Sequence, residues 1–490
     1  MKRLLALVLS LCFLLGGCAQ NETIQSDEKD DAEPTQSGET PAGPTFEKLA
    51  LRLSELPELP EEPDESALWD AMNGLSGEEQ SKLWEEFNGK QAAYRDAVQA
   101  LRGEGVDMAL TTPMTKYTLT TARQLFENEK EKNVVYSPAN LYLALCMLSE
   151  TTDGESRAQV LNLLGLENVE QARSAANALW RNLYRDSSTG KTLLANSMWL
   201  NQQFDYHEET VDTLAKDYYA STFRAAMGEK PTDEAIRAWI NENTKHLLEN
   251  AANGLETDPD TLMLLISTLY FKGTWVNQFE QWQTNEDIFT AANGAEQKID
   301  FMHQIKNGDY YRLGHYTAAA LPFTDGTTMW FLLPDAGTSL DDIWTLTWNL
   351  PMLAVDTSEG CYEIPDFTSL AQEGHGEIHW SVPRFDVDSD LDLIPVLQSL
   401  GVTDIFDDRA DFSPLTDLDA LVSAVKHAAR VKVDEEGCEA AAFTAIMAQA
   451  TSALIEPLPV VEMNLNRPFG FLITGVDGLP LFVGAVNTME

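Results

Sequence analysis

The stretch from Val431 to Ile473 reads VKVDEEGCEAAAFTAIMAQATSALIEPLPVVEMNLNRPFGFLI, and it decides how the whole chain is interpreted. A charged break, Glu435-Glu436-Gly437, leads into fourteen residues from Cys438 to Thr451 that are rich in alanine and contain no proline or glycine. The even positions of this run are uncharged and mostly small, which predicts a strand with one small apolar face. Alanine is also the best helix former and a poor strand former, so an amphipathic surface helix is the competing interpretation.

The chain before this stretch interleaves helical and β patterns without an internal repeat, which excludes a solenoid. Apolar runs predict buried strands at Thr328–Leu333, Leu262–Phe271 and Phe471–Val483. Periodic runs predict helices at Tyr117–Asn128, Leu141–Glu150, Ile236–Glu249 and Leu393–Leu400. We therefore predict a single α+β domain over residues 111–490.

Two motifs frame the alanine-rich run, and together they resemble the hinge and the signature of the serpins. The first is Glu435-Glu436-Gly437 with Glu439 and three alanines, and the second is Asn466-Arg467-Pro468-Phe469. Further segments similar to serpin motifs follow in the family's order: NVVYSP at 133–138, ALCML at 144–148, DGESR at 153–157, WINENT at 239–244, LYFKGTW at 269–275, LPF at 321–323, LLP at 332–334, VPR at 382–384 and GAV at 484–486. The resemblance covers the chain from Thr115 onward.

The resemblance implies a fold of three β-sheets with eight or nine helices and an exposed reactive-centre loop, at about 435–459 in this chain. It also implies a suicide inhibitor of serine proteases or of cysteine proteases. In that mechanism the protease forms an acyl-enzyme at a loop bond, and the cleaved loop inserts as a central strand of the large sheet. Fourteen extended residues span about 46 Å, and a 380-residue domain is roughly 54 Å across. The inserted strand would therefore cross nearly the whole molecule.

The resemblance also assigns roles to individual residues. Arg384 matches the basic partner of the hinge acid Glu435, Trp275 matches the aromatic residue beside them, and Ser137 and His427 match a cluster at the mid-sheet opening. Ser267 stands where the family has asparagine in that cluster, Cys438 replaces the usual threonine, and Phe443 replaces a small residue on the odd face. We expect Cys438 to lie near the exposed base of the intact loop. The implied hinge consists of Glu435, Glu436, Gly437, Cys438, Glu439, Ala440, Ala441 and Ala442.

The scissile bond is placed by counting about fourteen residues past Gly437, which gives Thr451–Ser452. The stretch from there to Pro468 is somewhat long, so Ala450, Ala453 and Leu454 remain alternatives. No lysine or arginine occurs between Lys432 and Arg467, which disfavours a trypsin-like target because such an enzyme needs a basic side chain in its specificity pocket. Small residues suit an elastase- or subtilisin-like protease.

The N-terminus carries the features of a bacterial secretory signal. Lys2 and Arg3 precede an apolar run, Leu4 to Leu15, that is too short to span a bilayer. Leu15-Gly16-Gly17-Cys18 resembles a lipobox, so we expect residues 1–17 to be a signal peptide and Cys18 to be lipidated. The expected location is therefore extracytoplasmic, with the protein anchored in the membrane of the bacterial cell envelope.

Two segments separate this anchor from the main domain. Residues 18–45 are acidic, polar and punctuated by proline and glycine, which predicts a disordered tether. Residues 46–110 predict a helical N-terminal extension, with helices near Ser66–Leu75 and Glu78–Leu101 and a capping box formed by Ser76 and Glu79. A spacer that packs on the next domain is the favoured role of this extension, and a recognition element is the alternative.

Composition and motif searches exclude several classes of function. The chain has 33 basic and 78 acidic residues, a net charge of −45, which argues against a nucleic-acid partner. No GxSxG, HExxH or GxGxxG motif is present, so we predict no catalytic residues, and His375 and His379 make only a weak case for a metal site. We expect a monomer that is not an enzyme and needs no cofactor. The alternatives are a non-inhibitory serpin-fold protein cleaved as a plain substrate, or an envelope-binding lipoprotein.

Overall fold

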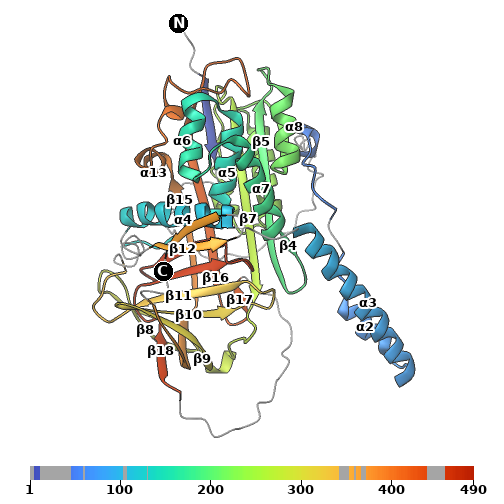
Figure 1. Cartoon of the computed structure of the whole chain (residues 1–490), viewed down its shortest axis with the longest axis vertical. Coiled ribbons are helices and arrows are strands. Elements are labelled where there is room, and N and C mark those ends of the chain that lie inside the picture. The colour runs from blue at the N-terminus through green and yellow to red at the C-terminus, as the bar shows by residue number, and fades with distance from the viewer. Residues whose placement is uncertain are drawn as a thin grey trace, which may run out of the picture.

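A computed structural model describes residues 5–10, 46–58, 61–102, 108–129, 131–340, 352–357, 360–365, 371–438 and 458–489. The described chain forms two large β-sheets and a small hairpin, with most helices packed on one of the sheets (Figure 1). No helix in these ranges is long and apolar enough to cross a membrane. The predicted α+β class is confirmed.

The first sheet contains the longest buried strands. Its order is β15, β16, a position shared by β1 at one end and β17 at the other, and then β7, β5, β6 and β2, with β4 beside β5. The bounds are β15 Phe385–Asp392, β16 Ala420–Val433, β1 Leu5–Ser10, β17 Gly437–Cys438, β7 Met263–Thr274, β5 Gly190–Asn201, β6 Ala220–Ala225, β2 Ala50–Arg52 and β4 Arg185–Asp186.

Helices cover both faces of this sheet, which explains why β7 is apolar along nearly its whole length. On one face, Leu264 and Ile266 of β7 pack in a cluster with Trp239 of α9. Met263 and Leu265, which alternate with these two residues along the strand, point the other way into the main core, as the two-residue period of a strand requires. The helices are α4 Met108–Asn128, α5 Pro138–Thr151, α6 Gly154–Leu164, α7 Val169–Leu183, α8 Glu208–Asp217, α9 Lys230–Asn243, α10 Glu249–Ala252 and α13 Ile394–Ser399, with short 3₁₀ turns at Gln281–Gln283 (η1) and Asp404–Phe406 (η3).

The second sheet completes the body. Its order is β18, β14, β9, β10, β11, β19, β20 and β3, with β8 beside β9, and β18 is parallel to β14. The bounds are β18 Val460–Asn464, β14 Ala371–Pro383, β9 Glu296–Leu313, β10 Tyr316–Pro322, β11 Thr328–Pro334, β19 Phe469–Thr474, β20 Pro480–Val486, β3 Val134–Tyr136 and β8 Asn285–Thr290. The separate hairpin pairs β12 Met352–Thr357 with β13 Gly360–Pro365.

Two of the predicted elements are wrong in extent. The run Phe471–Val483 was predicted as one strand, but it is an antiparallel pair, β19 and β20, joined by a turn in which Gly478 has φ 76°. The predicted helix Ile236–Glu249 stops at Asn243, because Lys245 and His246 adopt positive φ angles of 50° and 64° that cannot continue a right-handed helix.

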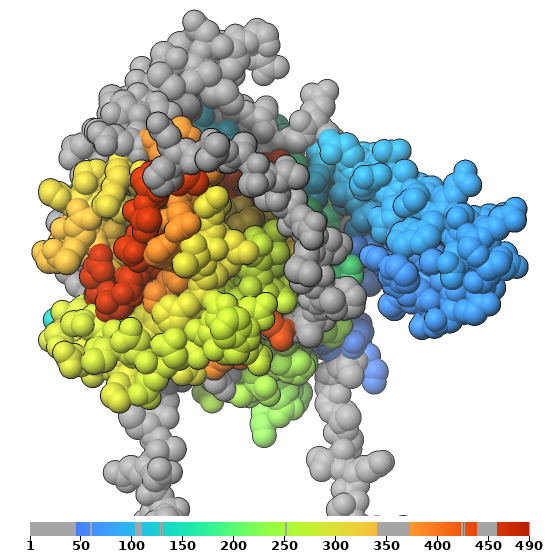
Figure 2. Space-filling model, turned by 90° about the horizontal axis from the view of Figure 1, so that it is seen from below, coloured from blue at the N-terminus to red at the C-terminus, as the bar shows by residue number. Residues whose placement is uncertain are grey.

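The N-terminal extension combines a docked part with a projecting part. α1 (Phe46–Leu49) and β2 lie against the body, and β2 pairs with the edge strand β6. α2 (Glu65–Met72) and α3 (Gly77–Arg102) then form a helical pair with its own small core, and Figure 2 shows this pair projecting from one flank. Glu79 accepts hydrogen bonds from the backbone N–H and the hydroxyl of Ser76, so the expected cap is present in part.

Candidate functional site: the hinge at the end of the first sheet

The hinge enters the first sheet between β16 and β7. β17 pairs antiparallel with both neighbours: Cys438 faces Val433 of β16, and Gly437 and Cys438 face Thr274 and Gly273 of β7. A tight turn leads into it, in which the backbone N–H of Glu436 donates to Asp434 Oδ1 at 3.0 Å. The chain beyond β16 therefore turns back and begins a new strand in the sheet.

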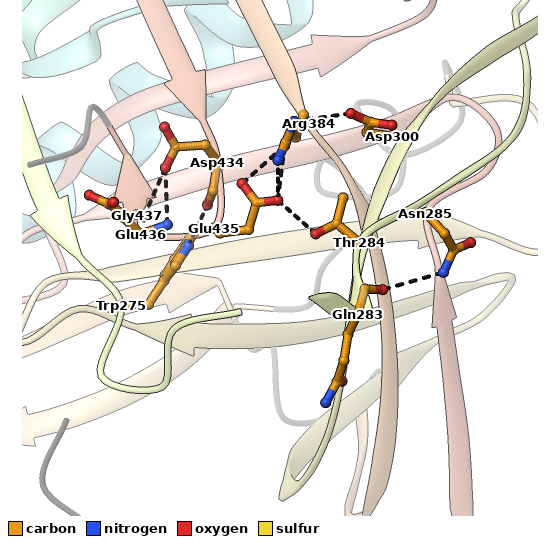
Figure 3. A network of polar contacts seen from close by, with 10 residues as sticks. All are labelled: Trp275, Gln283, Thr284, Asn285, Asp300, Arg384, Asp434, Glu435, Glu436 and Gly437. Atoms are coloured by element: carbon orange, nitrogen blue, oxygen red, sulfur yellow. Dashed lines mark hydrogen bonds and ion pairs between the residues drawn. The ribbon is translucent and has the colours of Figure 1, made fainter. Parts of the chain in front are cut away.

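The acid of the hinge is tied to residues at the ends of strands of the second sheet. Glu435 accepts hydrogen bonds from Arg384 Nε, which lies 3.0 Å from each carboxylate oxygen, and from Thr284 Oγ1 at 2.6 Å (Figure 3). Arg384 also reaches Asp300, with Nη1 3.0 Å from Oδ2. Burial alone would raise the pKa of Glu435, but these hydrogen bonds and the positive charge of Arg384 outweigh it, so the pKa lies below its usual value. The carboxylate is thus held ionised.

Backbone contacts and one aromatic residue fix the turn from the other side. The backbone N–H of Trp275 donates to Glu436 O at 2.9 Å, and its indole Nε1 donates to Asp434 O at 3.0 Å. The indole stacks on Phe323, with ring centroids 4.3 Å apart and planes inclined by 11°. The structure therefore brings together Trp275, Arg384 and the hinge acid, the three residues that the sequence comparison placed side by side.

Close packing at Gly437 leaves no room for a side chain. A Cβ atom built on Gly437 would lie 2.0 Å from the carbonyl oxygen of Gly273. Glycine at this position is what allows the hinge backbone to approach β7 closely enough to pair with it.

The expected position of Cys438 is wrong. We expected it near the exposed base of the loop, but it is buried, with 3% of its surface exposed. The physical reason is that β17 already lies inside the sheet at this residue, so its side chain packs in the main core rather than in solvent. Sequence could not reveal how far the hinge is inserted.

A second cluster lies in the middle of the same sheet. The backbone N–H of Ser137 donates to His427 Nε2 at 3.0 Å, and Ser137 Oγ caps α5 by accepting from the backbone N–H of Asn140 at 3.2 Å. Burial lowers the pKa of His427 to about 3, so the ring is neutral. Because Nε2 accepts, we assign the proton to Nδ1.

Sequence reasoning missed Asn140 in this cluster. Its Nδ2 donates to the carbonyl oxygen of Ser267 on β7 at 2.9 Å, so it links α5 to a strand on one side of the opening. The only available signal was its position, three residues after Ser137 and just beyond the NVVYSP motif. Ser267, which stands where the serpin resemblance implies an asparagine, is itself buried.

The space between β16 and β7 is filled by short strands at both ends. β17 occupies the end near the hinge, and β1 occupies the other, parallel to β16, with Leu5 facing Ala420 and Ser10 facing Lys426. β1 also pairs with β7 through Val8 and Leu9. Within the described residues, β16 and β7 share no ladder of their own. β1 thus lies within residues 1–17, the predicted signal peptide.

Several predicted site residues lie outside the described part of the chain. These are the lipidation residue Cys18, the hinge residues Glu439, Ala440, Ala441 and Ala442, and all positions for the scissile bond: Ala450, Thr451, Ser452, Ala453 and Leu454.

The two histidines of β14 each contact a carboxylate. His375 Nδ1 lies 2.7 Å from Asp309, and His379 Nε2 lies 2.9 Å from Glu377. In the described ranges, no group of three or more histidine, cysteine or acidic side chains could hold a metal ion.

Comparison with known proteins identifies the family. The family model described as "Serpin (serine protease inhibitor)" matches residues 112–489, and the chain belongs to the serpin family. Serpin-Z1B of Triticum aestivum is 26% identical over 394 residues, covering 76% of this chain and 94% of the relative. Neuroserpin of Mus musculus is 25% identical over 408 residues, covering 81% and 97%. The crystal structure of tengpin, a thermophilic serpin, in the native state superposes with a TM-score of 0.66 at 25% identity, covering 79% of this chain and 96% of tengpin.

Membership confirms the predicted family and fold. It supports a protease-inhibitor role in general and a protease as the partner, and it argues against a catalytic enzyme.

Proposed function

We propose that this protein is a covalent suicide-substrate inhibitor of serine proteases that works by cleavage of its reactive loop and insertion of the cut loop into the first sheet. The observation that carries the proposal is the pairing of Gly437 and Cys438 with both β16 and β7. A strand already begun between two strands that share no ladder within the described residues can be extended, and each added residue gains backbone hydrogen bonds on both sides.

The register of β17 supports a scissile bond after Thr451. Cys438 faces Val433, and the pairing is antiparallel, so each further loop residue would face the preceding residue of β16. Continued without a bulge, this register brings Thr451 opposite Ala420, which is the first residue of the 14-residue strand β16. Residues 438–451 would therefore cover β16 over its full length, whereas Ala453 or Leu454 would extend beyond its end.

The same register selects the most informative position in the loop. Thr444 would face His427 of β16 and Ser267 of β7, because Cys438 faces Val433 and Gly273 respectively. It has the same parity as Cys438, whose side chain is buried, so it would point into the core at the mid-sheet cluster. An arginine at this position would bury a charge that has no partner, which is strongly unfavourable.

We infer that the target is elastase- or subtilisin-like, or a cysteine protease that accepts small residues. The inference rests on the absence of lysine and arginine between Lys432 and Arg467 and on the small residues around Thr451. Trypsin-like enzymes require a basic residue before the cut, and this loop provides none.

The test of inhibition is an SDS-resistant 1:1 adduct after mixing with pancreatic elastase or subtilisin, with trypsin as the negative comparison. The parent protein should form the adduct, Thr444→Arg should be cleaved at a similar rate without forming it, and the odd-face control Gln449→Arg should resemble the parent. Cleavage of the parent without an adduct would instead identify a non-inhibitory serpin. A stable trypsin adduct would refute the specificity argument.

We also propose that the mature protein is a lipoprotein anchored to the bacterial cell envelope through Cys18. The support is the basic start, the short apolar run and the lipobox-like end of the first eighteen residues. Removal of residues 1–17 would also remove β1 from between β16 and β7 and leave that place for the cleaved loop. Fatty-acid labelling of the expressed protein, lost in Cys18→Ser, is the expected result, and equal labelling of both would refute it.

A further inference from the structure

A cavity of about 560 Å³ lies where the projecting helix α3 meets the body, next to β4. Its lining combines Tyr94 and Arg102 of α3 with Tyr184, Arg185 and Asp325 of the body. The residues from α3 precede position 112, where the match to the serpin family model begins, so the cavity combines this chain's extension with its serpin domain.

Two arginines face this cavity without a carboxylate partner. Neither Arg102 nor Arg185 forms an ion pair or donates a side-chain hydrogen bond within the described residues, although the chain carries 78 acidic residues. Arg185 Nη2 is buried and has no hydrogen-bond partner there. A buried guanidinium nitrogen without an acceptor is costly, so its presence calls for an explanation.

The electrostatic surroundings reinforce this observation. Burial and, to a smaller extent, the neighbouring positive charge of Arg102 lower the pKa of Arg185 to about 10. Burial likewise lowers the pKa of Arg102. The two guanidinium groups repel each other in a partly dehydrated space. The negative charges of Asp325 and Asp477 raise both pKa values but do not outweigh burial, so a further negative charge between the arginines would be favourable.

Three acidic residues that line the cavity form hydrogen bonds or ion pairs with groups other than the two arginines. Glu62 accepts hydrogen bonds from the backbone and the hydroxyl of Ser188. Asp186 forms an ion pair with Lys191. Asp325 accepts through Oδ1 from the backbone N–H of Thr327 at 3.0 Å and from its hydroxyl, while its buried Oδ2 has no hydrogen-bond partner within the described residues. None of the three is in hydrogen-bond contact with either arginine.

We propose that Arg102 and Arg185 form a binding site for a small oxyanion, of the phosphate, sulfate or carboxylate class, at the junction of the extension and the serpin domain. The planar guanidinium group suits all three because it can donate two parallel hydrogen bonds to a pair of oxygens. One arginine belongs to α3 and the other to β4, so a bound anion would bridge the two parts. It would add to their direct links, such as the hydrogen bond from Arg181 Nε to Leu101 O at 2.6 Å. The site is independent of the inhibitory mechanism.

Calorimetric titration of the full chain with phosphate, sulfate and citrate, in chloride buffers of matched ionic strength, tests the proposal. We expect saturable binding of at least one of these anions, and the three arms show which chemistry the site prefers. Arg185→Gln and Arg102→Gln should each weaken binding by about tenfold or more, since charge-assisted hydrogen bonds are lost. Lys82→Gln, which removes a positive charge from an exposed position of α3 outside the cavity, should bind like the parent.

Stability measurements separate binding from a merely structural role. In chloride, Arg185→Gln should be at least as stable as the parent, because it removes a repelling and unpaired charge. In the binding anion, only the parent should gain thermal stability. If Arg185→Gln fails to fold, Arg185→Lys provides the second variant, with the charge kept and the paired donors lost. No saturable binding, binding unaffected by both substitutions, or equal destabilisation of Arg185→Gln in all buffers would overturn the proposal.

Discussion

Replacing Gly437 with alanine should release the hinge from the first sheet. The new Cβ would lie 2.0 Å from the carbonyl oxygen of Gly273, far inside contact distance, and the obstructing atom is backbone that cannot rotate away. Overpacking of this kind costs about 1–3 kcal/mol. That cost corresponds to a change of about 5- to 150-fold in the equilibrium between a paired and a released hinge.

Cys438 reports directly on this equilibrium because it is buried only while β17 is paired. Its modification by a thiol reagent should be about 5- to 150-fold faster in Gly437→Ala than in the parent, since the reagent reacts with the released hinge. The measurement uses a background in which Cys12, Cys18 and Cys361 are serine. Cys146 is fully buried and burial raises its pKa, so it should remain silent.

Gly470→Ala is the matched control. A Cβ atom at Gly470 would have Leu332 Cβ as its nearest neighbour, at an ordinary contact distance of 3.6 Å. This variant should leave the labelling rate of Cys438 unchanged. If Gly437→Ala labels as slowly as the parent, the hinge does not depend on close approach to β7, and the reasoning is wrong.

Three further predictions concern stability. Glu435→Gln should lower the free energy of unfolding by about 1–2 kcal/mol, because Arg384 loses its charged partner. In the parent, the stabilisation from the Glu435 carboxylate is present above pH 4.5 and fades as pH falls below it, since the folded pKa of Glu435 is lowered. An unchanged urea midpoint at pH 7 would contradict this. His427 binds a proton below pH 6.5 in the unfolded chain but only near pH 3 in the folded chain. The free energy of unfolding of the parent should therefore fall by about 2 kcal/mol between pH 7 and pH 5, and that of His427→Gln should fall by less. Parallel pH profiles of the two proteins would exclude His427 as the cause. Phe46→Ala should cost about 1–2 kcal/mol, because Phe46 packs edge-on against Phe223 with centroids 6.1 Å apart; an unaltered thermal midpoint would mean that the docked extension does not stabilise the sheet.

Local sequence signals predicted the elements whose patterns are strong. The apolar run of β7, the capping residue Ser137 and the helices of the extension follow from periodicity and caps, which depend on neighbouring residues alone. The errors occurred where a backbone conformation ended an element. Positive φ at Lys245 and His246 broke a predicted helix, and such a conformation is uncommon for any residue other than glycine.

By itself, the sequence determined the family, the α+β class, the position of the hinge and the pairing of Glu435 with Arg384, because ordered motifs over the whole domain carry that information. Only the tertiary structure decided that Cys438 is already inserted, that Asn140 joins the mid-sheet cluster, and that Arg102 and Arg185 meet at one cavity. These facts depend on strand register and on contacts between residues far apart in the chain, such as Asn140 with Ser267 and Cys438 with Gly273. Such contacts are set by the packing of whole elements, and no local pattern of side chains encodes them.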